Sequence, residues 1–260
     1  MELNSSPKLN QNPIIGVVLR SSLNQPLKDI LHRCILREVP GGGWSSSRTD
    51  CSVNGVLFPG GSINLVTSGY ARVSRLIFDL AKEANDEGDY FPLWGTCLGF
   101  QLLACVVGHE EGIRLSHTHT LDVALPLNFT EEAKESRMFK DFPKNTLRAL
   151  AKEPVTANSH KYSVSTWTYK NNESLKAFYR VLTTNRSDKG KRFISTMEAY
   201  KYPFYGVQWH PEKSQFEWTG PTSHTRLLPS KLLSAAQTSL SVKRGKTFTD
   251  LTARQKRGKP

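Results

Sequence analysis

The sequence predicts an α/β protein of three layers, in which helices cover both faces of a doubly wound, mostly parallel sheet. Three observations favour this class: short β-branched apolar runs alternate with segments of helical apolar spacing, glycines close several of these runs, and 38% of the residues are apolar. The 260 residues suit one domain with or without a tail. We expect the domain to cover residues 13–218 and a basic, disordered tail to cover residues 219–260.

Most of the alternation between predicted strands and predicted helices lies in the first half of the chain. Apolar runs rich in β-branched or aromatic residues predict buried strands, and apolar residues at helical spacing predict helices. In chain order we expect a strand in residues 13–19, an irregular, glycine- and serine-rich segment in 20–52, a strand in 55–58, a helix in 71–84, a strand in 88–95 and a helix in 99–108.

The second half of the chain carries weaker strand signals. Residues 121–127 alternate apolar and polar positions, as a half-exposed strand does. Residues 191–199 and 204–212 are two apolar runs joined by the short segment "YKYP", which predicts a hairpin. We find no internal repeat.

The net charge of +12 first suggests a nucleic-acid partner, but its distribution argues against one. Residues 219–260 hold nine Lys or Arg and one acid, so this segment supplies +8, and the rest of the chain carries only +4. We therefore expect no nucleic-acid partner. Because no run of 18 apolar residues occurs, we expect no membrane span. The polar residues 1–13 show no signal peptide.

Cysteines and sequons bear on metal binding and location. The four cysteines (Cys34, Cys51, Cys97 and Cys105) lack metal-ligand spacing and do not indicate a disulfide framework, so we expect no metal site. Four N-x-[ST] sequons begin at Asn4, Asn128, Asn172 and Asn185. They favour a secretory route, and we expect glycosylation at the last three.

The stretch "GTCLG" places Cys97 between two glycines, after a predicted strand and before a predicted helix. Such a stretch is typical of a nucleophile elbow, in which Gly95 and Gly99 remove side chains that would clash at the sharp turn. The helix N-terminus favours a thiolate there. The alternative is that Cys97 packs as a small apolar residue in a βα turn.

The stretch "VQWHPE" offers a base for that thiol. His210 follows an apolar strand, so it lies at the rim of the sheet where Cys97 is expected, and Glu212 could orient its imidazole. The alternative is a structural histidine. His117 and His119 form an H-x-H without a further ligand, and we expect them on an exposed loop.

The stretch "FPGGS" closes a predicted strand with a glycine pair. The backbone N–H groups of Gly61 and Leu98 are candidate donors of an oxyanion hole, because an elbow nucleophile places the next residue's N–H there. The alternative is an ordinary Gly-Gly turn.

In this order the three stretches resemble the class I glutamine amidotransferase superfamily, which has a flavodoxin-like fold. Longer segments, among them "DYFPLWGTCLGFQLL", "EPVTANSHKYSVS" and "FISTMEAYKYPFYGVQWHPEKSQFEW", resemble its gamma-glutamyl hydrolase branch. The resemblance covers residues 13–19 and 53–218.

The resemblance implies a cysteine-type omega peptidase that cleaves gamma-glutamyl bonds of folylpoly-γ-glutamates, with Cys97 as nucleophile and His210 as proton carrier. Glu212 matches the acid of the superfamily's catalytic triad, and we expect it to be less important for catalysis than Cys97 and His210. The resemblance also implies a folate-metabolic role, a location in the lysosome or vacuole and the extracellular space, no cofactor, and compatibility with a homodimer.

The resemblance also implies that three further residues contact the substrate. Gly60 belongs to the glycine turn, and His160 matches a second histidine that the branch places near the substrate, although a surface histidine is the alternative. Gln101 stands where the branch often has glutamate.

The chain departs from the branch in residues 20–52 and after Trp218, and we hypothesise alternative splicing, a frame change or a gene-model error at both places. Two other functions therefore stay open: a glutaminase subunit that passes ammonia to a synthase, and an inactive, truncated product.

Overall fold

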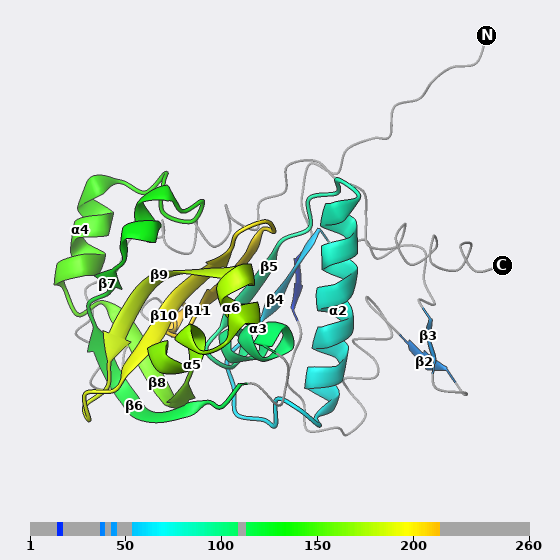
Figure 1. Ribbon diagram of the computed structural model, residues 1–260, viewed down its shortest axis with the longest axis horizontal. Helices are drawn as coiled ribbons and strands as arrows, with labels where there is room; N and C mark the ends of the chain where they lie inside the picture. Colours follow the sequence, from blue (N-terminus) through cyan, green and yellow to red (C-terminus); the bar gives the residue numbers. More distant parts are fainter. Residues whose placement is uncertain (1–14, 18–36, 40–42, 46–53, 109–112, 214–260) are drawn as a thin grey trace, which may run out of the picture.

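The centre of the molecule is a seven-stranded sheet (Figure 1). The computed structural model describes residues 15–17, 37–39, 43–45, 54–108 and 113–213. Across the sheet the strands follow the order β1 (Ile15–Val17), β4 (Gly55–Phe58), β5 (Leu93–Thr96), β11 (Phe204–Val207), β10 (Arg192–Ala199), β9 (Tyr179–Arg186) and β7 (Asn128–Phe129).

The sheet is mixed, whereas the sequence predicted a mostly parallel one. Strands β1, β4, β5 and β11 pair in parallel, and β11, β10, β9 and β7 pair in antiparallel fashion. The correction has a simple cause: only four residues connect β10 to β11, and so short a connection permits only an antiparallel pair. That hairpin itself was predicted correctly.

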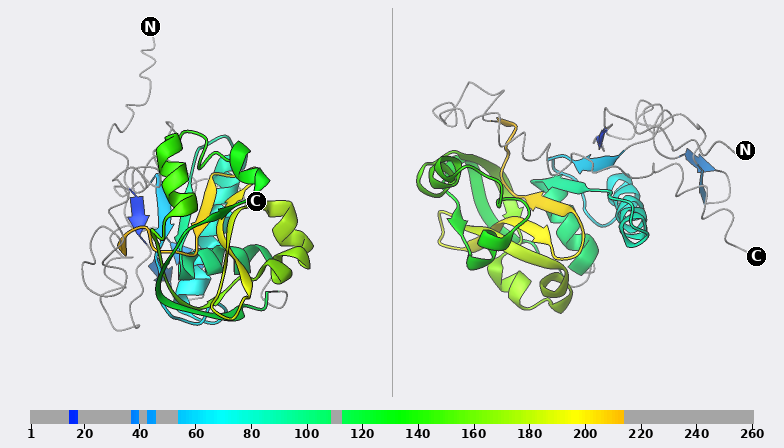
Figure 2. Two further views of the ribbon diagram at one scale, coloured as in Figure 1. Left: turned by 90° about the vertical axis from the view of Figure 1, so that its left-hand side faces the viewer. Right: turned by 90° about the horizontal axis from the view of Figure 1, so that it is seen from above.

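Helices lie on both faces of the sheet, so the predicted three-layer α/β class is confirmed (Figure 2). On one face lie α2 (Gly69–Asp86), α3 (Leu98–Gly108), α5 (Thr166–Lys170) and α6 (Glu173–Phe178). The short helix η1 (Glu131–Glu135) and α4 (Lys144–Lys152) lie on the other. Each face has its own apolar cluster, and neighbouring residues of β5 enter different ones: Leu93 joins the cluster under α2 and α3, and Trp94 the cluster that includes Leu150 of α4.

A second unit, the antiparallel ribbon of β6 (Ser116–Leu125) and β8 (Thr156–Ser163), carries side chains to the site. The sequence predicted only residues 121–127 of it as strand, and β8 was missed. His117 and His119 are exposed as expected, but they lie on β6, not on a loop. The pattern failed because β6 has two register shifts, which interrupt the period-two alternation.

The segment 20–52, expected to be irregular, contains a short antiparallel hairpin of β2 (Arg37–Val39) and β3 (Gly43–Ser45). The rest of that segment and the predicted tail 219–260 lie outside the described residues. Among the described helices, none is both long and apolar enough to cross a membrane.

Candidate active site

Cys97 stands on a strained turn between β5 and α3. Its φ angle is +51°, in the left-handed region that side chains other than glycine rarely adopt. Its N–H donates to the carbonyl of Val207 on β11 at 2.8 Å, and its carbonyl accepts from Gln101 N–H in the first turn of α3. The turn thus fixes the cysteine at the helix N-terminus, as the sequence predicted for an elbow.

Two glycines make this turn sterically feasible. A Cβ at Gly99 would lie 2.0 Å from the carbonyl oxygen of Phe58, and one at Gly95 would lie 2.6 Å from the backbone of Gly99. Both distances are far below van der Waals contact, so helix α3 can approach the strands only with glycine at these positions. The spacing G-x-C-x-G therefore has a direct structural cause.

His210 lies beside Cys97 and binds Glu212. Its Nδ1 is 2.6 Å from Glu212 Oε1, and its main-chain N–H donates to the carbonyl of Ala157 on β8. Burial of the ring lowers the pKa of His210, but hydrogen bonds to Cys97 and Glu212 and their charges outweigh burial and raise it to about 9. His210 is therefore protonated at neutral pH. The structure brings together all three residues predicted to be catalytic.

Gly60 of the "FPGG" loop packs against both groups. A Cβ at Gly60 would lie 2.7 Å from Cε1 of His210 and 3.4 Å from Cβ of Cys97. Helix α2 holds this loop, because the Tyr70 hydroxyl donates to the Pro59 carbonyl at 3.4 Å. The next residue, Gly61, is exposed. The loop therefore reaches the cysteine from β4, as expected for an oxyanion turn.

His160 is buried behind the site, so the alternative of a surface histidine is wrong. Its Nε2 faces Asn158 Oδ1 at 3.3 Å, and its Nδ1 faces Thr118 Oγ1 at 3.4 Å. Because the Asn158 oxygen can only accept, Nε2 carries the hydrogen and Nδ1 accepts from Thr118. Burial, together with the charge of His210, lowers the pKa of His160 to about 4, so this ring is neutral at neutral pH.

Gln101 connects the elbow helix to the two histidine-bearing segments. Its Nε2 donates to the Tyr162 carbonyl at 2.7 Å and to Gln208 Oε1 at 3.1 Å. Gln101 and Gln208 are both buried. The amide therefore braces β8 and the chain before His210 against α3. Sequence reasoning assigned it to the substrate and missed Gln208, Asn158 and Thr118, although the first two lie inside the quoted motifs.

The two described cysteines differ in environment. Cys105, on α3, is buried, and burial raises the pKa of its thiol to about 11. It packs in the apolar cluster under α2 and α3 and serves as a core residue. Within the described residues, no group of three or more His, Cys, Asp or Glu side chains is placed to hold a metal ion.

The predicted glycosylation sites differ in access. Asn128 is exposed. Asn172 caps α6, and its Nδ2 donates to the Gly108 carbonyl at 3.0 Å. Asn185 is only 3% exposed, and its Nδ2 donates to the Pro126 carbonyl. Because a glycan attaches at Nδ2, the folded chain leaves no room for one on Asn185, and Asn128 is the most accessible of the three.

The structure therefore sets a cysteine elbow at the end of a β-strand, next to a histidine–carboxylate pair. Residues 45–221 match the family described as "Glutamine amidotransferase class-I", and the chain belongs to that family. Within it, the chain is a member of the gamma-glutamyl hydrolase branch, which confirms the resemblance read from the sequence motifs.

The relatives give the extent of this match. The chain is 54% identical to gamma-glutamyl hydrolase of Bos taurus over 167 residues, which are 64% of this chain and 52% of the bovine protein. It is 46% identical to the Homo sapiens enzyme over 224 residues, which are 80% of this chain and 70% of the human protein. The chain thus spans about half the length of the bovine relative. A crystal structure of a glutamine amidotransferase from Thermotoga maritima is similar at 15% identity and a TM-score of 0.37, covering 80% of this chain and 79% of that one.

Proposed function

We propose that this chain hydrolyses gamma-glutamyl amide bonds in folylpoly-γ-glutamates through a thioester on Cys97. The observation that carries the proposal is the hydrogen bond between His210 and Cys97, with Cys97 held at a φ of +51° and His210 Nδ1 2.6 Å from Glu212 Oε1. The similarity to gamma-glutamyl hydrolases supplies the bond type and the substrate class.

The residues support two half-reactions. In the first, the proton already rests on His210, and the deprotonated sulfur of Cys97 attacks the γ-carbonyl carbon. His210 then protonates the departing amine, and a thioester remains. In the second, His210 takes a proton from water, the resulting hydroxide attacks the thioester, and the thiol leaves with the proton from His210. Glu212 keeps the imidazole oriented through Nδ1 in both steps.

We infer that the oxyanion of each tetrahedral intermediate is held by backbone N–H groups of Leu98 and Gly61. Leu98 begins α3, so its N–H is one of the unpaired donors of a helix N-terminus. Gly60 lets the loop approach His210 and Cys97 closely, because a Cβ there would clash with the ring, and His160 supports the pocket wall as a neutral group. Gln101 acts by bracing this wall. None of these steps needs a metal or an organic cofactor.

The family also supports a location. We infer that the protein works in the lysosome or vacuole or in the extracellular space, with Asn128 as the most accessible sequon and a homodimer as a compatible assembly.

The deciding experiment compares two substrates on the purified chain. We expect glutamate or oligoglutamate to be released from a pteroyl-poly-γ-glutamate, with no ammonia released from glutamine. A Cys105→Ala variant is the matched control, because it removes a buried thiol outside the site and should retain activity. Ammonia release from glutamine without cleavage of the polyglutamate would instead favour a glutaminase subunit, and a folded chain inactive on both substrates would favour the inactive product.

A further inference from the structure

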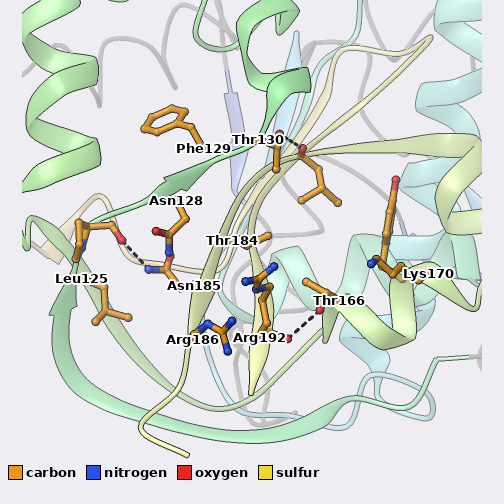
Figure 3. Close-up of a pocket in the computed structure, with 13 residues that line it drawn as sticks. Leu125, Asn128, Phe129, Thr130, Thr166, Lys170, Thr184, Asn185, Arg186 and Arg192 are labelled. Carbon is orange, nitrogen blue, oxygen red and sulfur yellow. Dashed lines mark hydrogen bonds between the residues drawn. The ribbon is translucent and has the colours of Figure 1, made fainter. Parts of the chain in front are cut away.

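A pocket lies at the edge of the sheet formed by β7 and β9 (Figure 3). Its cavity has a volume of about 670 Å³. Part of its wall is apolar and comes from Leu125, Phe129 and Val181. The rest is polar, and its charged residues are all cations: Lys170, Arg186 and Arg192. The pocket can therefore surround an organic body and present positive charge to it.

Two of the cations are cross-strand neighbours. Arg192 on β10 and Arg186 on β9 are direct partners in the antiparallel register, so their side chains leave the same face of the sheet. Figure 3 shows both on the wall of this pocket. Like charges directly opposite each other destabilise an antiparallel pair. An anion that lies between the two arginines would relieve this repulsion and stabilise the strand pair.

No protein group neutralises these cations in the part of the chain that the structure describes. No ion pair there involves Lys170, Arg186 or Arg192. Within the described residues, Arg186 Nη1 donates a single long hydrogen bond, to the Gly190 carbonyl at 3.3 Å. The two guanidinium groups thus retain most of their donors for a ligand, and guanidinium matches the oxygens of carboxylates and phosphates.

The arginine pair lies toward the same end of the sheet as Cys97. Strand β9 runs in the direction of β5, because β10 is antiparallel to both β9 and β11 and β11 is parallel to β5. Across the sheet, β9 lies three strand spacings from β5, a distance of about 14 Å. Along the strand direction, Arg192 lies four residues beyond the level of Thr96, a distance of about 13 Å. The arginine pair is therefore on the order of 20 Å from Cys97.

We propose that this pocket binds an organic oxyanion, with Arg186 and Arg192 as the paired donors and Lys170 as the third charge. The expected ligand carries several carboxylates on an aliphatic chain. Two sources fit: a free polycarboxylate, or the distal carboxylates of a γ-glutamyl chain whose other end lies at Cys97. The second source rests on the proposed function. A γ-linked residue is longer than the ~3.5 Å of an α-linked one, so fewer than about six of them span this distance.

The first experiment tests the site without catalysis, using citrate as a tricarboxylate probe. It measures thermal unfolding of the full chain in citrate and in sodium chloride of equal ionic strength. Protein made in bacteria is used, so that every sample carries the same unmodified Asn128, which also lines the pocket. Citrate should raise the melting temperature by several degrees more than chloride, because a ligand that binds the folded state stabilises it.

The variant Arg186→Gln/Arg192→Gln should lose the citrate effect, and without citrate it should melt no lower than the parent, because the repulsion is gone. The charge control is Lys189→Gln, on the same hairpin but outside the pocket lining, and it should retain the effect. Equal effects of citrate and chloride on the parent would overturn the proposal, and so would a citrate effect that survives in the double variant.

The second experiment identifies the source of the anion. It measures binding of di- and hexa-γ-glutamate to a Cys97→Ala chain by calorimetry. If the pocket holds the distal end of the substrate, the double arginine change should weaken hexa-γ-glutamate binding about fivefold or more and leave the dimer unchanged. If the pocket binds a free anion instead, the double arginine change should abolish the citrate response and leave the binding of both γ-glutamate peptides unchanged. Loss of hydrolysis in the parent chain would count against the proposed function and would leave the citrate result unaffected.

Discussion

The two histidines near Cys97 lie in different regions and have opposite electrostatic environments. His210 follows β11 and contacts a thiol and a carboxylate, and its pKa rises to about 9. His160, on the β6–β8 ribbon, contacts a hydroxyl and an amide, and burial with the nearby charge of His210 lowers its pKa to about 4. Both rings are buried, so burial alone does not decide the protonation state. The groups that contact each ring decide its protonation state, and only His210 has contacts that suit it to transfer protons.

The largest effect should come from Cys97→Ala. We expect hydrolysis of a pteroyl-poly-γ-glutamate to fall by several powers of ten, as when other covalent nucleophiles are removed. The change also deletes one of the groups that raise the pKa of His210, so that pKa should fall below about 9, towards that of His160. Activity assays and NMR titration of the imidazoles measure the two results. Near-normal turnover with unchanged folding would refute the elbow assignment.

The next largest effect should come from His210→Asn, because the thiol loses its proton acceptor and the leaving amine its donor. We expect a loss of at least about a thousandfold in kcat. The pH profile is the sharper measurement: the limb that reports His210 should disappear. A profile like the parent's would show that another group, such as His160, carries the proton.

A smaller effect is expected from Glu212→Gln. The amide still accepts from Nδ1 of His210 but carries no charge, so the pKa of His210 should fall and the acid form should be lost at lower pH. Because the Glu212 side chain is 46% exposed, water can partly replace it, and we expect a loss in kcat of roughly tenfold to a hundredfold. A kcat unchanged across the pH range would mean that Glu212 does not orient the ring.

The smallest effect on chemistry is expected from His160→Gln, which should raise KM more than it lowers kcat. Its clearer effect is on stability. The unfolded histidine takes up a proton near pH 6.5, whereas the folded one does so only near pH 4, so the parent loses stability as pH falls from 6.5 to 4. The variant should lose less over this range in urea unfolding. An identical pH dependence would show that His160 does not titrate in this way.

His210 has the opposite sign in the same measurement. Its folded pKa lies above the unfolded value, so its stabilising contribution is complete below pH 6.5 and disappears as pH rises through about 9. The His210→Asn protein should therefore lose less stability than the parent on the alkaline side. This pair of unfolding curves tests the comparison of the two histidines independently of catalysis.

Features that depend on neighbouring residues can be predicted from the amino-acid sequence. Gly95, Cys97 and Gly99 specify the elbow because the clashes that they avoid arise within one turn. The strand at Gly55–Phe58 and the helix at Gly69–Asp86 follow from local apolar spacing, and the order of the three motifs indicated the family.

The tertiary structure alone decided the features that join distant segments. The mixed strand order, the burial of His160 and Asn185 and the register that sets Arg186 opposite Arg192 all depend on which strands pair. Gln101 reaches Gln208 across 107 residues. Such contacts are selected by the packing free energy of the whole sheet rather than by local preference, so no stretch of sequence predicts them. The charge states of the two histidines follow from those contacts, because desolvation and nearby charges set a pKa only once the chain has brought them together.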